Sequence, residues 1–507
     1  MNFLKRVIYH NNYASMIRMF NKLISNKKYE WALILYFLIW MIAPILCSSS
    51  FPLDVPEGIY WGREFQLGYY KHPPFSSWIL YSFYYVFGQF GPYLLSQICI
   101  VITMYCVYLL AKKLVSHEKA VLSSCLLLGV FYYTWPSLEF NHNIAQMPIW
   151  AGLIYLFYLV LQKNTWLLWT VFGVVMGIGM LTKYSVAILI ISMVIFSFIT
   201  PYRQIWLSAK PWVAVCIALI VFSPHFIWLY QNDWLTIHYI QARSHEDGNA
   251  KDRIGALKFL VTQLINFIPL LIILACAKCL KFKKIIIKYT DWTFLIFLGL
   301  FPAISLFLLG VTTGLTIKDM WASPMWCLVP LLFIIMVPDD VFTNKKPILW
   351  NGLCIWLIVV TTLMIVYVQF GGQIRNKPSR MDWPQVQLSE NIEQQWNSKS
   401  VCKLDTIGGD NWLAILSATA MKNMPSVYMS DSEKYSNWVD LNRLKTHGSV
   451  MLWEKDQRPI LPYFSELQKD SNLVVYNGEW NLSWHKVPKK EPLQVEWYLF
   501  VPKQCLK

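Results

Sequence analysis

The run WALILYFLIWMIAPILC at residues 31–47 decides the fold class. An uninterrupted apolar run of this length can cross a bilayer with little tilt, so it predicts a first membrane span over 31–48. A stretch dense in ionisable groups follows almost at once, PLDVPEGIYWGREFQLGYYKHPP at residues 52–74. The chain therefore places acids, cations and a histidine directly beside its first span.

The composition of the whole chain agrees with a membrane protein. Of 507 residues, 56% are hydrophobic and only 14% are charged, whereas soluble domains are about 25% charged. The net charge is +15, which fits Lys and Arg gathered in loops that face anionic lipid. Nucleic-acid binding is excluded as a main function, because no basic stripe with interleaved aromatic residues stands out.

Further apolar runs predict about eleven spans, or up to thirteen. Basic clusters fall on every second loop, which places the N-terminus inside and the polar tail outside by the positive-inside rule. The shorter run 75–88 is expected to be an interfacial helix. The other predicted spans are 91–110, 120–135, 144–161, 165–181, 185–200, 212–230, 255–277, 292–310, 322–337 and 348–370.

The tail changes character from Gly371 onward, where polar residues alternate with short apolar runs. The run LQVEWYLFV at 493–501 alternates like a β-strand, and the tail is long enough for a small domain. We therefore expect three parts: a cytoplasmic segment 1–30, a membrane domain 31–370, and an exported α+β domain 371–507. Cys402 and Cys505 could pair if this tail is exported.

Ionisable residues outside the spans gather on the outer face, whereas the inner loops are merely basic. Acids, histidines, Lys and Arg beside lipid suit a ligand with an anionic head and a hydrocarbon tail. Lys and Arg would hold its phosphate, and an Asp would act as general base on an acceptor hydroxyl. A polyprenyl-phosphate sugar is such a ligand.

Several outer-face motifs resemble one family. The pattern D-x-x-E-G-x-x-W-G-R-E at 54–64 precedes YYKHPP at 69–74, and FNHN (140–143), GMLTKY (179–184), SPHFIWLYQNDW (223–234) and KDMWASPMW (318–326) follow in order. Together they resemble the GT-C glycosyltransferases of the protein-mannosyltransferase superfamily, close to the lipid A aminoarabinose transferases. The resemblance runs from about residue 31 to the end.

The resemblance implies a catalytic base in the first outer loop. Asp54 matches that position, and it would deprotonate the acceptor as the sugar leaves its lipid phosphate with inversion. The family usually carries an adjacent acidic pair there, whereas this chain has Asp54 and then Glu57 three residues on. Glu57 therefore stays a second candidate for the base.

Four cations are candidates for binding the donor phosphate. Arg63 matches a family arginine, although a local ion pair with Glu64 is an alternative. Lys183 lies in a short outer turn between two uncharged spans, a costly place without a partner. Snorkelling to the interface is the alternative for Lys71 and Lys183. The candidates are Arg63, Lys71, Lys183 and Arg243.

Other outer residues are candidates for sugar or acceptor contact. His142 could instead cap its span, and Lys318 could pair with Asp319. A divalent metal is possible because some relatives hold one through an acid and a histidine, with His245 a weak candidate; interfacial histidines are the alternative. The substrate candidates are Tyr69, His72, Asn141, His142, Lys318 and Asp319.

The sequence thus predicts a glycosyltransferase of the bacterial inner membrane with a periplasmic active site. It would move a sugar from a polyprenyl-phosphate donor to lipid A or the lipopolysaccharide core. The alternatives are a protein O-mannosyltransferase-like enzyme, a glycan ligase or polymerase, a transporter, and a non-catalytic scaffold. A transporter should carry ionisable groups near the middle of its spans and internal repeats, and neither pattern is seen here.

Overall fold

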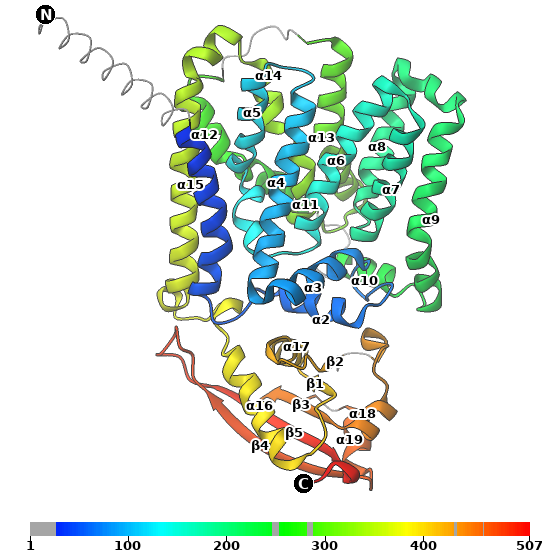
Figure 1. Ribbon diagram of the computed structural model, residues 1–507, viewed down its shortest axis with the longest axis vertical. Coiled ribbons are helices and arrows are strands. Elements are labelled where there is room, and N and C mark those ends of the chain that lie inside the picture. Colours follow the sequence, from blue (N-terminus) through cyan, green and yellow to red (C-terminus); the bar gives the residue numbers. More distant parts are fainter. Residues whose placement is uncertain (1–26, 246–252, 281–286, 430–432, 460) are drawn as a thin grey trace, which may run out of the picture.

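The computed structural model describes residues 27–245, 253–280, 287–429, 433–459 and 461–507. The predicted inner segment 1–30 therefore lies mostly outside the described residues, as does most of the basic loop 278–288. A long helical bundle stacks on a smaller domain with a β-sheet (Figure 1). The prediction of a mainly α polytopic membrane protein with a small α+β C-terminal domain is confirmed.

The bundle contains the apolar helices. Among the described residues, six helices are long and apolar enough to cross a membrane, up to ten if each bent pair is one span, and Trp166–Thr182 is a shorter apolar helix. The helices are Lys27–Cys47, α2 Asp54–Glu64, α3 Phe75–Phe87, α4 Gly91–Ala111, α5 His117–Cys125, α6 His142–Lys163, α7 Trp166–Thr182, α8 Val186–Ile199, α9 Ala209–Gln231, α10 Leu235–His245, α11 Arg253–Asn266, α12 Ile268–Cys276, α13 Tyr289–Thr313, α14 Val329–Met336 and α15 Asp339–Arg375.

Three runs predicted as single spans are bent, and a fourth bend directly follows the predicted span 185–200. The run 120–135 forms His117–Gly129 and then turns by 89° into Phe131–Leu138. Proline explains part of this pattern, because it lacks a backbone N–H and clashes with the preceding turn. Pro201 begins the segment after a bend of 106°, and Pro269 stands one residue past a bend of 41°. The remaining bend, of 47°, separates Asp319–Trp326 from Val329–Met336.

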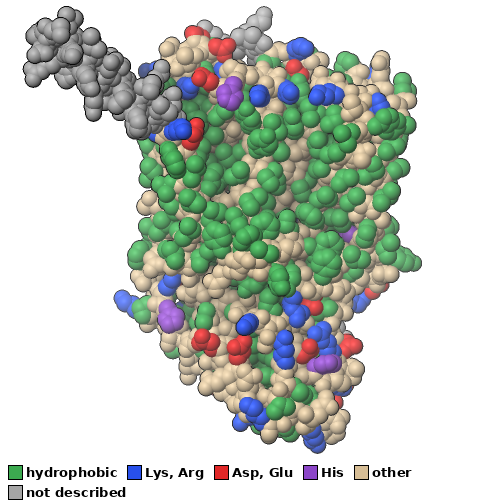
Figure 2. All heavy atoms as spheres, in the orientation of Figure 1, with side chains coloured by type: hydrophobic (Ala, Val, Ile, Leu, Met, Phe, Trp, Pro, Cys, Tyr) green, Lys and Arg blue, Asp and Glu red, His purple; other side chains and the backbone are tan. Residues whose placement is uncertain are grey.

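Charge and hydrophobicity are layered along the molecule. Figure 2 shows apolar side chains in a broad middle band, with Lys and Arg gathered along the end away from the C-terminal domain. The C-terminal domain and the end of the bundle next to it carry both acidic and basic side chains in the same view. This layering is what a multi-pass membrane protein with basic loops on one side requires.

The C-terminal domain is built around a five-stranded sheet of order β2-β1-β3-β5-β4. Strand β1 pairs in parallel with β2 and β3, whereas β5 is antiparallel to both β3 and β4. The strand predicted at 493–501 is confirmed as β5. The elements are α16 Gln385–Lys399, β1 Thr406–Gly409, α17 Asn411–Ala420, β2 Ser426–Met429, α18 Leu441–His447, β3 Ser449–Glu454, α19 Pro462–Lys469, β4 Leu473–Leu482 and β5 Leu493–Pro502.

A disulfide joins Cys402 to Cys505, 103 residues apart in sequence. The pairing that the sequence left open is therefore present. It ties the segment before β1 to the short helical turn after β5, so both ends of the sheet domain are fixed together. A cross-link over so long a loop restricts the unfolded chain strongly.

The two parts share a hydrophobic core. Tyr60 and Trp61 of α2 are 1% exposed and belong to the same buried cluster as Leu388 and Val427 of the C-terminal domain. The Tyr60 hydroxyl lies 3.0 Å from Met429 Sδ, and the Tyr84 hydroxyl donates to the Thr419 carbonyl at 2.8 Å. Helices α2 and α3 lie at the end of the bundle that faces this domain (Figure 1), so the C-terminal domain holds α2 in place.

Candidate active site

The stretch expected as the first outer loop is largely a helix. Helix α2 begins at Asp54 and has Asp54 and Glu57 in its first turn. Residues three apart lie on one face of a helix, and a helix N-terminus favours negative charge. Asp54 and Glu57 are not adjacent in the sequence as the acidic pair of the family is, but the helix still places their two carboxylates side by side.

Two hydrogen bonds hold Asp54 in a defined position, and a third fixes the Asn141 side chain that makes one of them. Its backbone N–H donates to Glu139 Oε1 at 2.6 Å, and the Asn141 side-chain amide donates to Asp54 Oδ2 at 3.2 Å. The oxygen of the same Asn141 side chain accepts from the Asn143 N–H at 2.9 Å and so caps α6. Because the cap fixes the amide plane, Asn141 can only present its NH₂ group to Asp54. The capping role considered for His142 belongs to Asn141.

Glu57 is engaged by a cation. Lys71 Nζ lies 2.6 Å from Glu57 Oε1, and the two side chains are 25% and 13% exposed. The Tyr70 hydroxyl is 3.5 Å from the same oxygen. Burial opposes the charge of Lys71, but the Glu57 carboxylate outweighs it and raises the pKa of Lys71. Lys71 is therefore a permanent cation at this point.

Lys183 approaches from the turn between α7 and α8. It caps the end of α7, and its ammonium group donates to Asn143 Oδ1. Burial lowers the pKa of Lys183 to about 8, although the charge of Asp54 works against this. Burial raises the pKa of Asp54 in turn, opposed first by Lys71 and then by the Asn141 bond, Lys183 and Arg243. Three cations thus surround one carboxylate.

Glu139 is a member of this cluster that the sequence analysis did not select. Burial, together with the charge of Asp54, raises the pKa of Glu139 to about 8. The bend after Gly129 delivers Glu139 to the N-terminus of α2. The available signal was that Glu139 is the only acid between residues 136 and 143.

His72 and His142 lie together beside the charged groups. Their ring centroids are 3.8 Å apart. Burial, with His142, Lys183 and Lys71 nearby, holds the pKa of His72 well below its usual range, so this ring is neutral. His142 Nε2 is buried and has no hydrogen-bond partner within the described part of the chain. The pair can offer neutral hydrogen-bonding groups to a sugar.

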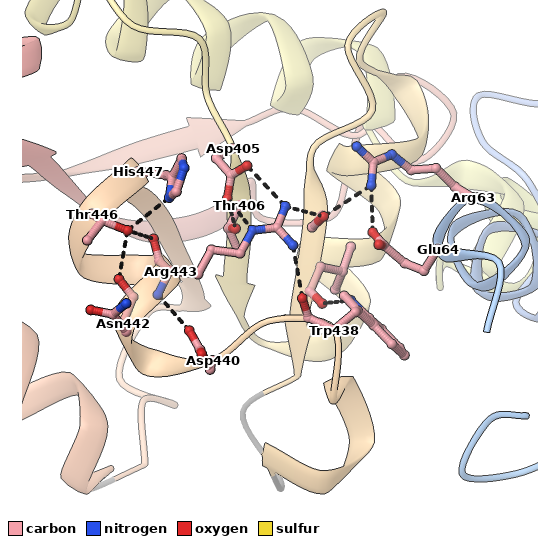
Figure 3. A network of polar contacts seen from close by, with 12 residues as sticks. Arg63, Glu64, Asp405, Thr406, Trp438, Asp440, Asn442, Arg443, Thr446 and His447 are labelled. Atoms are coloured by element: carbon pink, nitrogen blue, oxygen red, sulfur yellow. Dashed lines mark hydrogen bonds and ion pairs between the residues drawn. The ribbon is translucent and has the colours of Figure 1, made fainter. Parts of the chain in front are cut away.

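Arg63 does not reach this cluster. It follows Asp54 by nine residues, which at about 3.6 residues per turn places it on the opposite face of α2. Its guanidinium pairs with Glu64 at 2.6 Å and donates to Ser426 Oγ at 3.1 Å. Figure 3 shows Arg63 facing the C-terminal domain, where Arg443 binds Asp405. The local ion pair considered for Arg63 is present, so we leave Arg63 out of the site.

The remaining candidates lie in several places. Tyr69 is 1% exposed, stacks on Trp61 and donates to the Trp61 carbonyl at 2.5 Å, which is a packing role. The backbone carbonyl of Asp319 accepts a hydrogen bond from the Tyr132 hydroxyl at 2.8 Å, and Asp319 itself is exposed to solvent. Lys318 is half-buried beside it, and the side chain of His245 lies outside the described structure.

No set of three or more His, Cys, Asp or Glu side chains in the described ranges is placed to hold a metal ion. The acids and cations of the cluster offer a chemistry of their own. It comprises an oriented carboxylate on Asp54, a neutral histidine pair, and cations within electrostatic reach of one point. That combination suits proton removal next to an anionic leaving group.

Comparisons with known proteins show what the whole chain is similar to. The family model described as dolichyl-phosphate-mannose-protein mannosyltransferase matches residues 71–228. A lipopolysaccharide core galacturonosyltransferase of Rhizobium johnstonii is 24% identical over 59% of this chain and 62% of its own. A lipid A galacturonosyltransferase of the same organism is 24% identical over 42% of this chain and 46% of its own. The chain is therefore similar in sequence to transferases of the lipopolysaccharide core and of lipid A.

A solved structure extends the likeness to the whole fold. The structure of ArnT from Cupriavidus metallidurans bound to undecaprenyl phosphate matches with a TM-score of 0.61 at 10% identity. The match covers 92% of this chain and 97% of that one. The predicted GT-C fold and the predicted relationship are both confirmed. The chain spans only about three fifths of the first curated relatives it matches, 62% and 63% of their lengths.

We expect Glu139→Gln to stabilise the protein. Glutamine keeps the oxygen that accepts from the Asp54 N–H but removes a buried negative charge. Glu139 has a folded pKa of about 8, above its ordinary value, so the wild type loses stability as pH rises from about 5 to 8. The variant's gain in thermal midpoint should therefore grow over that range, measured by intrinsic fluorescence in detergent.

Glu139→Ala is the matched control, because it removes both the charge and the oxygen. It should gain less than Glu139→Gln at pH 8 and lose stability at pH 5. Equal midpoints for wild type and Glu139→Gln at every pH would show that Glu139 ionises normally.

Proposed function

We propose that the protein is a glycosyltransferase that uses a polyprenyl-phosphate sugar. The acceptor is a hydroxyl of lipid A or of the lipopolysaccharide core, at the periplasmic face of the bacterial inner membrane. The observation that carries the proposal is the convergence of Asp54, Lys71 and Lys183, from three separate segments, at the end of the apolar bundle. A lipid-borne phosphate reaches that depth with its chain still in the bilayer.

The chemistry is a single displacement. Asp54 takes the proton of the acceptor hydroxyl while that oxygen attacks the anomeric carbon of the sugar. The bond from the anomeric carbon to the phosphate oxygen breaks, and the configuration inverts. Lys183, Lys71 and Arg243 stabilise the charge that develops on the leaving phosphate, in a site where burial strengthens each interaction.

We assign the base to Asp54 rather than Glu57. Glu57 is bound by Lys71 at 2.6 Å, so protonating it would break a buried ion pair. Asp54 accepts only one side-chain hydrogen bond, from Asn141 at 3.2 Å, among the residues that the structure describes. One of its oxygens is therefore available to a substrate hydroxyl, and burial keeps the pKa of Asp54 above its usual range, as a base near neutrality needs.

The exported face is supported by the cysteines. The disulfide between Cys402 and Cys505 belongs to the domain that shares a core with α2. Disulfides persist in oxidising compartments such as the periplasm. The end of the bundle without this domain carries a row of Lys and Arg side chains (Figure 2), as a cytoplasmic face does.

The proposed acceptor is tested by mass spectrometry of lipid A and core from a deletion strain. Loss of the mass of one sugar from a glycolipid supports the proposal and gives the class of that sugar, such as a hexose, a uronic acid or an amino sugar. A protein acceptor is the second candidate, because the matching family model is described by protein mannosylation. Unchanged glycolipids together with glycoproteins that have lost a sugar would favour it over the lipid acceptor.

Asp54→Asn should abolish transfer while the protein still folds. The amide keeps the size and the hydrogen bond partner of the aspartate but cannot take a proton. Loss of a general base typically costs about 10²–10⁴-fold in kcat, which initial-rate assays with radiolabelled donor can measure. Glu57→Gln should lose less, because the carboxylate it removes is bound to Lys71.

Glu64→Gln is the control for this pair, since Glu64 lies on α2 but pairs with Arg63. It should transfer sugar at close to the wild-type rate. Retained activity in Asp54→Asn, with loss in Glu57→Gln, would move the base to Glu57.

Donor binding should weaken as pH rises through about 8. Lys183 has a lowered pKa of about 8, so above that pH it loses the charge that attracts the donor phosphate. The kcat/KM for the donor should then fall towards tenfold per pH unit. Lys183→Arg keeps a charge at all pH values, and its profile should stay flat to at least pH 9. A wild-type profile that is flat to pH 9 would contradict this role.

A further inference from the structure

The motif SPHFIWLYQNDW at 223–234 lies outside the charge cluster, where α9 leads into α10. Helix α9 runs along the edge of the bundle toward the end that faces the C-terminal domain (Figure 1). Pro224 has no backbone N–H to give to the Ile220 carbonyl, but the Ser223 hydroxyl donates to that carbonyl at 2.8 Å. The helix continues past this point and carries His225 on its last two turns.

His225 joins two segments that are far apart in the sequence. Its side chain is fully buried. Nδ1 lies 2.7 Å from the Leu67 carbonyl oxygen, and Nε2 lies 2.5 Å from the Tyr184 hydroxyl. A carbonyl can only accept, so Nδ1 carries the proton, and Nε2 of the neutral ring accepts from the Tyr184 hydroxyl. Because both ring nitrogens are used, the ring cannot turn without losing a hydrogen bond.

Three successive residues, 67–69, are held by α9 and α10. The histidine bridge binds the carbonyl of the first. Gly68 packs directly on Trp228, and a Cβ there would lie 2.3 Å from Trp228 Cε3, so this approach requires glycine. The buried Thr236 hydroxyl of α10 donates to the Tyr69 carbonyl at 2.8 Å. These contacts fix the backbone path of the segment.

Each end of the histidine bridge stands next to a cation of the site. The turn 69–72 follows the held segment, is closed by a backbone hydrogen bond of 3.1 Å between its first and last residues, and carries Lys71. At the other end, Tyr184 directly follows Lys183, and both lie in the short turn between α7 and α8. A displacement of Tyr184 therefore moves Lys183 as well.

We infer that His225 is a positioning residue of the donor site. It fixes the turns that carry Lys71 and Lys183 relative to each other, and so sets the spacing of two cations that hold the donor phosphate. The inference rests on the proposed function and deepens it, because His225 acts without touching the donor. The attraction between an ammonium group and a phosphate falls with their separation, so loss of the bridge weakens donor binding and leaves Asp54 in place.

Tyr184→Phe removes the hydroxyl from the bridge and keeps the ring. The Kd of radiolabelled undecaprenyl phosphate, measured on the purified full-length protein in detergent, should rise about three- to tenfold, the effect of one lost hydrogen bond. The transfer rate at saturating donor should stay within about twofold of wild type, because an effect confined to binding leaves kcat unchanged.

Trp206→Phe is the matched control. Trp206 Nε1 donates to Ser197 Oγ at 2.8 Å near the opposite end of α8. This variant also loses one hydrogen bond and keeps an aromatic ring, but it does so away from the site. Its Kd for undecaprenyl phosphate should equal that of wild type.

His225→Asn breaks the same contact from the other side. An asparagine amide can still donate to the Leu67 carbonyl, but it is too short to reach Tyr184. The variant should bind undecaprenyl phosphate as weakly as Tyr184→Phe does. The double variant should bind no more weakly than either single one, because both substitutions remove one shared interaction.

Lys183→Ala distinguishes a positioning role from general destabilisation. When Tyr184 acts through Lys183, adding Tyr184→Phe to the Lys183→Ala variant should change the Kd by less than about twofold. A contact that only stabilises the fold would lower the thermal midpoint and leave the Kd of the folded protein unchanged.

The outcomes separate this inference from the proposed function. Wild-type protein that does not bind undecaprenyl phosphate, or that binds it no better than Lys183→Ala does, contradicts the proposed function itself. Binding that needs Lys183 but is unchanged in Tyr184→Phe and His225→Asn contradicts only the positioning role. A Tyr184→Phe effect of equal size with and without Lys183 would also overturn that role.

Discussion

Three carboxyl groups lie close together in a partly buried place, and their mutual repulsion constrains the whole site. The negative charge of any one of them makes it less favourable to ionise the others, because burial removes the water that would screen the charges. The three residues are Asp54, Glu57 and Glu139. Only nearby cations can keep any of them charged, and Lys71 and Lys183 supply that charge. The bundle must therefore bring a turn from α7, a loop before α3 and a bent segment after α5 to the first turn of α2. A site assembled in this way is complete only when the helices are correctly packed.

Helix α2 connects this charge cluster to the C-terminal domain. One face carries Asp54 and Glu57, while Tyr60 and Trp61 are buried in a core shared with the sheet domain. Arg63 on the opposite face from Asp54 binds Ser426 of β2. The domain thus fixes the rotation of α2, and with it the direction of the Asp54 carboxylate. In the proposed function, the domain would therefore position Asp54 through its packing on α2.

The sequence was sufficient for the fold class and for the end of the bundle at which the candidate ionisable groups gather. Composition and alternating basic loops depend on transfer energies that act residue by residue, so they are visible without a structure. Bends within apolar runs are not, because hydropathy averages over the positions where a helix turns. The bend after Gly129 is an example, because it brings Glu139 to Asp54 and the hydropathy of the run did not predict it.

Local conformation was the second limit. Treating 52–74 as a loop left Arg63 free to join Asp54, whereas a helix over Asp54–Glu64 directs them to opposite sides. The number of residues between two side chains therefore shows whether they lie together only when the secondary structure of that segment is known.

The central claim is that the cations beside Asp54 form the binding site of a lipid-borne phosphate. The most direct test is a cryo-electron microscopy structure of the protein with polyprenyl phosphate bound. We predict a phosphate within hydrogen-bond distance of Lys183 Nζ and on the side of Asp54 that faces Lys71, with the Asp54–Asn141 contact preserved. A phosphate bound instead at Arg63, or elsewhere in the bundle with Lys183 still bound only to Asn143, would contradict the account.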